Sequence, residues 1–352
     1  MKPDLSIIIP FAGEYPQVLF TVQSIAESLI NKLDFEIIVI NNDCKELRDQ
    51  WKHARNRVAD NLRGKFKRGD ITEEDILEVI RPLTCMTGLN DKGITKSADA
   101  LKASAGGNPW LKYMEFSEYL SHWECKRLAC LEAKADTFLF VDAHCIISTN
   151  LADMWSTYLD GYDNIGSFHM PLTYKILEWR RLVYKMVVER GFYGYSFTGF
   201  PGVTDAGHDP VEVPCMSTCG MMISRRIYER VGGWPANFGA YGGGENFMNY
   251  ALSVTGHSKF IYPAITCHHH GEGRDYHSTY DGTLWNRLVA HYLFGGAEAL
   301  HDLRRNSKGR PIVLDEMEGG ILANTEYKKH RAIIKRNTTV SLKDWVKDWE
   351  EE

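Results

Sequence analysis

Apolar runs and segments with helical spacing alternate along the first part of the chain. Leu5–Pro10 and Phe35–Ile40 are nearly continuous apolar, β-branched runs, a pattern typical of strands buried on both faces of a parallel sheet. Between them, Gln17–Leu33 carries apolar residues at helical spacing and predicts a helix. The order strand, helix, strand predicts an α/β fold, in which ligands bind beyond the carboxyl ends of the strands.

The middle of the chain continues with less regular patterns. Phe116–Ala135 predicts a helix and Thr137–Val141 a third buried strand. Leu177–Arg190 predicts an amphipathic helix, and the aromatic, glycine-rich stretch that follows, residues 191–201, predicts a loop. Its aromatic side chains either pack internally or stack on a sugar or a base.

The last third predicts a strand and a helix within Cys219–Val231, a helix from Glu245, and a strand over Lys259–Ile265 that ends in three histidines. Beyond about Tyr276 the chain is charged and helical in pattern. We expect one α/β domain over residues 1–275 and a helical C-terminal extension over residues 276–352.

Residues 45–115 interrupt the α/β pattern, and we interpret them as a charged, partly helical insertion. Lys45–Arg68 is strongly basic, and Ile71–Val79 predicts an acidic helix. The tract Gly88–Pro109 predicts a loop. A basic run of this kind is either a solvated helix face or a surface that meets a polyanion such as DNA.

Composition narrows the class of protein. The 352 residues are 44% hydrophobic and 25% charged, the balance of an ordinary globular protein. No apolar run is long enough for a membrane span or a signal peptide. Eight cysteines without a CxxC pair predict neither a disulfide framework nor a zinc ribbon, so we expect a cytoplasmic protein. The net charge of −5 argues against a globally basic nucleic-acid coat.

Two strand ends carry residues suited to a metal ion. Asp142 and His144 follow the third predicted strand, where alternation points both side chains the same way. A carboxylate with an imidazole suits Mn²⁺, Zn²⁺ or Fe²⁺ better than Mg²⁺ or Ca²⁺. A third ligand is expected from His268, His269 or His270. Taken alone, an Asp-x-His at a strand end is better explained by an Asp that caps a helix.

Glycines precede a carboxylate in a second candidate segment. Gly232-Gly233-Trp234-Pro235 is followed by Gly242-Gly243-Gly244-Glu245-Asn246. Glycines let a loop approach a ligand closely and would set Glu245 and Asn246 beside it. The simpler interpretation makes Glu245 a favourable charge at a helix N-terminus.

In this order, the segments resemble GT-A-fold glycosyltransferases of the family-2 type. Their motifs are most similar to those of polypeptide N-acetylgalactosaminyltransferases, which have an Asp-x-His, a Gly-Gly-Glu-Asn loop and a late metal-binding His. The resemblance covers about residues 5–272 and implies a Rossmann-like, mostly parallel central sheet flanked by helices. It is carried by Leu5–Pro10, Ile37–Asp43, Phe138–His144, Gly232–Trp234, Gly242–Asn246 and Pro263–Gly271.

The resemblance implies a role for each matching position. Asp142, His144 and His269 would hold a divalent metal, most simply Mn²⁺, on the diphosphate of a nucleotide sugar, with Ala143 between the first two. Lys126, or its neighbour Arg127, would supply a basic residue from the preceding helix. Trp234, Glu245 and Asn246 would face donor sugar and acceptor. The base and ribose pocket would be lined by Pro10, Phe11, Ala12, Glu14, Asn42 and Asp43.

The implied activity is transfer of a sugar from a nucleotide-diphosphate donor, such as a UDP-sugar, to an acceptor hydroxyl. Inverting relatives use an Asp as base where this chain has Asn246, so either Glu245 takes that role or the enzyme retains configuration. The family's anchor, stem and lectin segments have no counterpart here, so we do not expect a secretory, mucin-type role. A hydroxymethylated base in DNA, a glycan and a peptide are the candidate acceptors.

Three alternatives belong to other classes. A nucleotidyltransferase would carry a basic, glycine-rich phosphate loop after the first strand, and Phe11-Ala12-Gly13-Glu14 lacks the basic residue. A non-catalytic nucleotide-sugar or metal-binding module would have lost the metal ligands or the carboxylate, whereas both are present. A zinc protein using His268–His270 would bind metal without nucleotide. The oligomeric state has no signal in the sequence.

Overall fold

The structure is a computed structural model of the chain. The described residues are 2–11, 14, 17–41, 68–69, 91–116, 120–174, 182–189, 192–199, 209–239, 242–270, 280–307 and 311–350.

Within these residues the larger sheet has eight strands. They are β1 (Leu5–Phe11), β2 (Phe35–Asn41), β3 (Leu111–Glu115), β4 (Thr137–Phe140), β6 (Gly166–His169), β10 (Val211–Glu212), β11 (Met221–Ser224) and β12 (Ser258–Ile261). Their spatial order is β10-β12-β6-β11-β4-β1-β2-β3. The strands β4, β1, β2 and β3 are parallel, while β11 runs antiparallel to both β4 and β6. The expected α/β class with a mostly parallel central sheet is confirmed.

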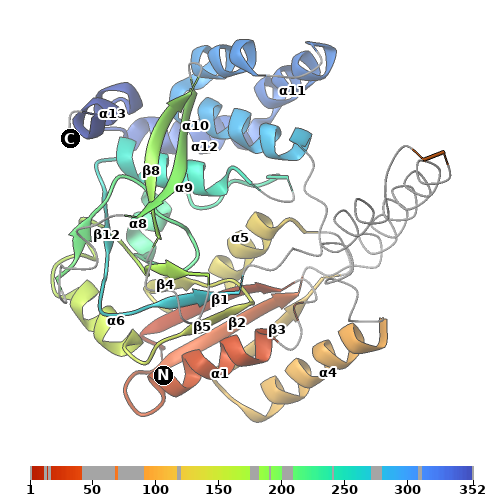
Figure 1. The fold of residues 1–352 in the computed structure, drawn as a ribbon, viewed down its shortest axis with the longest axis vertical. Coiled ribbons are helices and arrows are strands. Elements are labelled where there is room, and N and C mark those ends of the chain that lie inside the picture. The colour runs from red at the N-terminus through yellow and green to blue at the C-terminus, as the bar shows by residue number, and fades with distance from the viewer. Residues whose placement is uncertain are drawn as a thin grey trace.

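A second sheet of five strands adjoins the first. Its strands are β5 (Cys145–Ile147), β7 (Leu172–Thr173), β8 (Leu182–Glu189), β9 (Phe192–Gly199) and β13 (Cys267–His269), in the order β5-β13-β7-β8-β9. The antiparallel pair β8 and β9 extends toward the C-terminal helices, where β9 contacts α10 (Tyr280–Asn306) (Figure 1).

Helices cover both faces of the larger sheet (Figure 1). Alternation along β1 explains why: Ile7 and Ile9 belong to one buried cluster and Ile8 to another, so the strand needs apolar partners on each side. The cluster of Ile7 and Ile9 is packed by α1 (Gln17–Leu29), α4 (Asp91–Gly107) and α6 (Leu151–Leu159). The cluster of Ile8 is packed by α5 (His122–Glu132), α8 (Arg225–Arg230), α9 (Gly244–Val254), α10, α11 (Pro311–Ala323) and α12 (Thr325–Asn337). A last helix, α13 (Leu342–Glu350), lies against α9.

The C-terminal region is helical, as the sequence predicts, and its helices complete the second core. Leu288, Leu293 and Tyr327 are buried in the cluster that also contains Phe140 of β4. Among the described residues, no helix is both long and apolar enough to cross a membrane.

Three predictions from the sequence are wrong. Residues 182–189 form strand β8, not part of a helix, and residues 192–199 form strand β9, not a loop. The β-branched and aromatic residues of both segments favour a pleated strand, and pairing with each other satisfies both backbones. Gly88–Pro109 is largely helix α4, because its four alanines outweigh its glycines and Leu101 anchors it in the core.

Other strands also differ from the sequence prediction. The expected strand Lys259–Ile265 is shorter, since β12 ends at Ile261, and His268 and His269 belong to β13 in the other sheet. Strand β3 was not predicted. The basic run before Arg68 and the acidic segment Ile71–Val79 lie outside the described residues.

Candidate functional site

Two strand ends from different parts of the chain meet beside the larger sheet. Asp142 and His144 lie in the short connection between β4 and β5, and the Val141 amide still donates to the Ile8 carbonyl at 3.1 Å. Strand β13 pairs antiparallel with β5, which sets His269 opposite Cys145. The His270 amide donates to the His144 carbonyl at 3.0 Å and fixes this register.

The side chains of these residues converge. The Nε2 atoms of His144 and His269 lie 3.0 Å apart, and His269 Nε2 lies 3.4 Å from Asp142 Oδ2. All three residues are buried, with 6% to 8% of their surface exposed. His269 Nε2 therefore lies close both to a carboxylate oxygen of Asp142 and to the Nε2 of His144. The ligand atoms of Asp142, His269 and Cys219 lie within 4.8 Å of one another.

This donor set fits a divalent transition-metal ion. Carboxylate and imidazole ligands together suit Mn²⁺, Fe²⁺ or Zn²⁺. His144 Nδ1 lies 3.8 Å from Glu14 Oε1, and a carboxylate behind a ligating imidazole is the usual outer partner that fixes the ring. The residues at hand thus suit the group that the resemblance implies.

The three neighbouring histidines are not equivalent. His268 points away from the cluster, because its Nδ1 is hydrogen-bonded to Thr173 Oγ1 at 2.7 Å. Burial and the nearby His270 lower the pKa of His268. Alternation along β13 puts His269 alone beside Asp142.

A buried lysine stands on the other side of Asp142. Lys126 is 1% exposed, and its Nζ lies 3.9 Å from Asp142 Oδ1. The ammonium lies 5.0 Å from the ring centroid of Trp123, 5.5 Å from that of Trp234 and 5.8 Å from that of Phe140. Aromatic faces stabilise a desolvated cation at this range. The rings of Trp123, Trp234 and Phe140 thus form an aromatic box around Lys126, which we call the lysine box, beside Asp142.

Helix α5 positions this lysine. Its N-cap is Ser121, whose Oγ accepts from the Glu124 amide at 3.1 Å. His122 lies one turn before Lys126 on the same face, with its Nε2 at 3.8 Å from Asp142 Oδ1. His122 is a site residue that was not predicted from the sequence. Its position four residues before Lys126 was the available signal.

The glycine-rich segment before Glu245 is held by the C-terminal helix α10. Asn286 is fully buried; its Nδ2 donates to the Gly242 carbonyl at 2.7 Å and its Oδ1 accepts from the Gly239 amide at 2.6 Å. Gly242 and Gly243 have φ of +80° and +71°, which glycine adopts without strain. The helical extension therefore helps to shape the segment that leads to Glu245.

Glu245 and Asn246 open helix α9. Glu245 is half-buried in the first turn and Asn246 is buried. Asn249 fixes this turn, since its Nδ2 donates to the Glu245 carbonyl and to the Met216 carbonyl, both at 2.8 Å. Gly244 lies against Trp123: a Cβ there would lie 2.3 Å from the ring. The loop and the lysine box are thus in direct contact.

The expected nucleotide pocket is described in part. Pro10 and Phe11 are buried at the end of β1, and Ala143 is buried between Asp142 and His144. Trp234 is 1% exposed and contributes to the lysine box. Ala12, Asn42 and Asp43 lie outside the described residues.

A polar chain that the sequence analysis missed lies at the neighbouring strand ends. Asn41 Nδ2 donates to the Tyr113 hydroxyl at 2.8 Å, and that hydroxyl donates to Glu115 Oε2 at 3.2 Å. Tyr113 and Glu115 belong to β3, whose strand character was not foreseen.

Solved structures of other proteins are similar to this chain in fold. The crystal structure of GalNAc-T7 with UDP, GalNAc and Mn²⁺ matches with a TM-score of 0.58 and 12% identity, over 96% of this chain and 57% of that chain. The chain has the GT-A fold.

Other solved GT-A structures match at lower TM-scores. The mannosyltransferase PcManGT from Pyrobaculum calidifontis, in complex with GDP-Man and Mn²⁺, matches at 0.48 with 13% identity, over 96% of this chain and 86% of that chain. S. aureus TarS 1–349 in complex with UDP-GlcNAc matches at 0.46 with 10% identity, over 98% and 81%. This chain spans little more than half the length of the GalNAc-T7 chain. No protein-family model and no curated protein matches the sequence.

Proposed function

We propose that the protein is a metal-dependent glycosyltransferase that takes its sugar from a nucleotide-diphosphate donor, most simply a UDP-sugar. The observation that carries the proposal is the convergence of Asp142, His144 and His269 at the strand ends of a GT-A fold. The GalNAc-T7 structure with UDP, GalNAc and Mn²⁺ supports the same pairing of fold and ligands.

Asp142, His144 and His269 would hold Mn²⁺ or a similar ion. A bound divalent cation neutralises the charge that develops on a departing nucleoside diphosphate. Lys126, buried at 3.9 Å from Asp142, would place a second positive charge beside the same diphosphate. Because Asp142 and Lys126 are buried, little water would screen the attraction between these positive charges and the diphosphate.

Glu245 is the carboxylate assigned to the sugar and acceptor side. It lies in the first turn of α9, directly after glycines that let the loop approach a ligand. Asn246 has no titratable group and cannot serve as a base. Glu245 would therefore orient the donor sugar or accept the proton of the acceptor hydroxyl. The Glu-Asn pair favours retention of configuration.

A transfer assay tests the proposal. The full chain with Mn²⁺ is given each UDP-sugar in turn, with and without an acceptor, and UDP release is measured. The acceptors are a duplex with a hydroxymethylated base, an oligosaccharide and a peptide. We expect UDP release from one donor, with Asp142→Asn and Glu245→Gln each at least about tenfold slower. If no donor is turned over and none binds, the proposal is wrong.

A further inference from the structure

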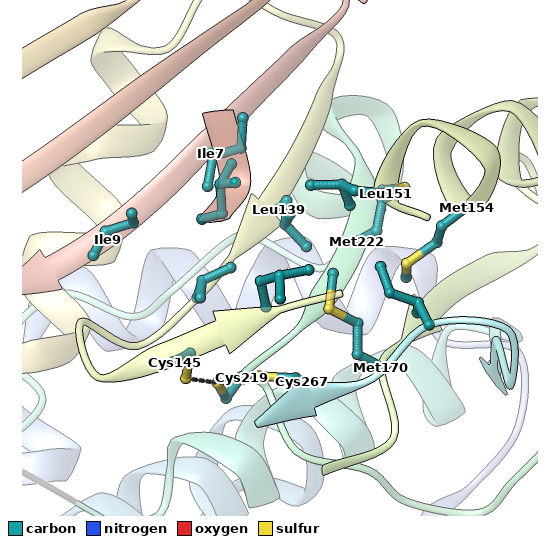
Figure 2. Close-up of a cluster of buried hydrophobic side chains, with 14 of the residues drawn as sticks. Ile7, Ile9, Leu139, Cys145, Leu151, Met154, Met170, Cys219, Met222 and Cys267 are labelled. Atoms are coloured by element: carbon teal, nitrogen blue, oxygen red, sulfur yellow. Dashed lines mark hydrogen bonds between the residues drawn. The ribbon is translucent and has the colours of Figure 1, made fainter. Parts of the chain in front are cut away.

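Three buried thiols meet next to the candidate metal cluster. Cys145, Cys219 and Cys267 are each at most 3% exposed and are free cysteines. The Sγ of Cys219 lies 3.4 Å from that of Cys145 and 4.0 Å from that of Cys267. All three sulfurs lie within 4.8 Å of one another, and Figure 2 shows them side by side next to strands β5 and β13.

The strand pairing explains why the sulfurs converge. Cys145 of β5 lies opposite His269, and Cys267 lies two residues before His269 on the same face of β13. Cys219 arrives from the connection before β11 in the other sheet, where the next amide, Gly220, donates to the Phe140 carbonyl at 2.7 Å. The three thiols therefore join the two sheets at one point.

The sulfur spacing matches that of a thiolate metal site. Zinc binds cysteine sulfur at about 2.3 Å in a tetrahedron, which places neighbouring sulfurs about 3.8 Å apart. The observed separations of 3.4 Å and 4.0 Å bracket this value. A disulfide needs about 2.0 Å, so the sulfurs are not at bonding distance.

We infer that Cys145, Cys219 and Cys267 bind a thiophilic divalent cation such as Zn²⁺. Cys219 Sγ also lies within 4.8 Å of ligand atoms of Asp142 and His269, which makes these two residues the described candidates for a fourth ligand. Soft thiolates select Zn²⁺ over Mn²⁺, whereas the carboxylate and imidazole set accepts either. This site is structural, and the inference does not depend on sugar transfer.

Such an ion would hold together the elements that carry the imidazoles. Cys145 directly follows His144, and Cys267 shares its short strand with His269. An ion bound only in the folded state stabilises that state in proportion to the logarithm of its concentration over its dissociation constant. The site therefore links zinc content to the stability of the β5–β13 pair.

Cobalt substitution tests the inference in the full, reduced chain without nucleotide. Co²⁺ bound to thiolates gives a sulfur-to-metal charge-transfer absorption that carboxylate and imidazole ligands do not give. We expect this band at one equivalent, its displacement by Zn²⁺, and a loss of at least about a third of its intensity in Cys145→Ser and in Cys267→Ser. The control Cys215→Ser removes a buried thiol outside the cluster and should keep the band. His144→Ala should also keep it.

A second measurement needs no variant, in case the serine variants fail to fold. One equivalent of Zn²⁺ should raise the melting temperature of the wild-type chain by several degrees and should stay bound to the folded chain through dialysis. Absence of a charge-transfer band and of zinc stabilisation in the wild-type chain would overturn the inference. Persistence of the band at full intensity in folded Cys145→Ser and Cys267→Ser would do the same.

Discussion

His144 and His269 are separated by 125 positions in the sequence, yet their Nε2 atoms lie 3.0 Å apart. Antiparallel pairing of β5 with β13 produces this approach, and both rings are buried. Two neutral imidazoles at this distance form one hydrogen bond, in which one Nε2 carries the proton and the other accepts it. A cation bound between them would instead be coordinated by both nitrogens, with no proton on either. The two rings can therefore hydrogen-bond to each other without a metal ion and could both bind one when it is present.

The first prediction separates His269 from its neighbour in the sequence. His269→Ala removes one of the three converging ligands and should weaken Mn²⁺ binding at least about tenfold, a loss typical of a ligand or its close support. His268→Ala is the matched control, because that ring bonds to Thr173 instead. Mn²⁺ titration followed by calorimetry or electron paramagnetic resonance measures both affinities. Equal losses in the two variants would exclude the assignment.

The second prediction concerns the close approach of the glycine loop to helix α5. Gly244→Ala places a Cβ 2.3 Å from the Trp123 ring, so either the ring or the loop must move. Overpacking of this kind costs about 1–3 kcal/mol of unfolding free energy. Gly106 lies in helix α4 with open space at the Cβ position. Gly106→Ala should therefore raise the unfolding free energy, by about 1 kcal/mol at most. Urea denaturation of the two variants should show opposite signs.

The third prediction compares two buried lysines. Lys126→Met removes the charge beside Asp142 and should lower the affinity for UDP at least about fivefold. Lys259→Met serves as its control, because Lys259 bonds to Ser253 Oγ at 2.7 Å and lies over the Trp345 ring instead. The control should bind UDP as the wild type does. Fluorescence or calorimetric titration with UDP distinguishes the two.

The fourth prediction follows from the pKa of Lys259. Burial lowers this pKa from 10.5 to about 8. Between pH 8 and 10.5 the unfolded chain therefore binds more protons at this residue than the folded chain, so the unfolding free energy rises with pH. The rise amounts to about 3 kcal/mol at most. The difference in unfolding free energy between wild type and Lys259→Met should show it, and a flat difference over this range would exclude it.

The fifth prediction concerns the loss of stability at acidic pH that His169 causes. Burial lowers the pKa of His169 to about 3, against 6.5 when exposed. Its Nδ1 donates to the Ser217 carbonyl at 2.8 Å and its Nε2 accepts from the Ser167 hydroxyl at 2.8 Å, so the neutral ring is fully bonded. Below pH 6.5 the unfolded chain binds a proton that the folded chain does not, and stability falls as pH decreases toward 3.

Replacing His169 isolates that contribution. Between pH 6.5 and 4.5, the unfolding free energy of His169→Gln should fall by about 2 kcal/mol less than that of the wild type. Denaturant midpoints at the two pH values give the comparison. Identical pH dependence in both proteins would assign acid lability to other groups.

The sequence predicts the central strands well because their apolar runs leave little choice. Leu5–Phe11 and Phe35–Asn41 are buried along almost their whole length, so a single periodicity describes them. The β8–β9 pair could not be predicted in the same way. It forms by backbone pairing between residues 182–189 and 192–199, which the spacing of apolar residues within one segment does not reveal.

The candidate site likewise contains residues that are close in sequence and residues that only the fold brings together. Asp142 and His144 are two positions apart in the sequence, so they could be selected together from it, although both lie in the connection after β4 and not in a strand. The support from Asn286 and the approach of Cys219 arise from contacts between distant elements. No local pattern marks either residue.

Binding of UDP to the wild-type chain and to Asp142→Asn, with and without Mn²⁺, is the most direct measurement for the proposed function. Calorimetry should show UDP binding at least about tenfold tighter with Mn²⁺ in the wild type, and no such gain in a folded Asp142→Asn variant. UDP binding that does not respond to Mn²⁺, or an equal Mn²⁺ response in Asp142→Asn, would contradict the assignment of Asp142, His144 and His269 as the metal site.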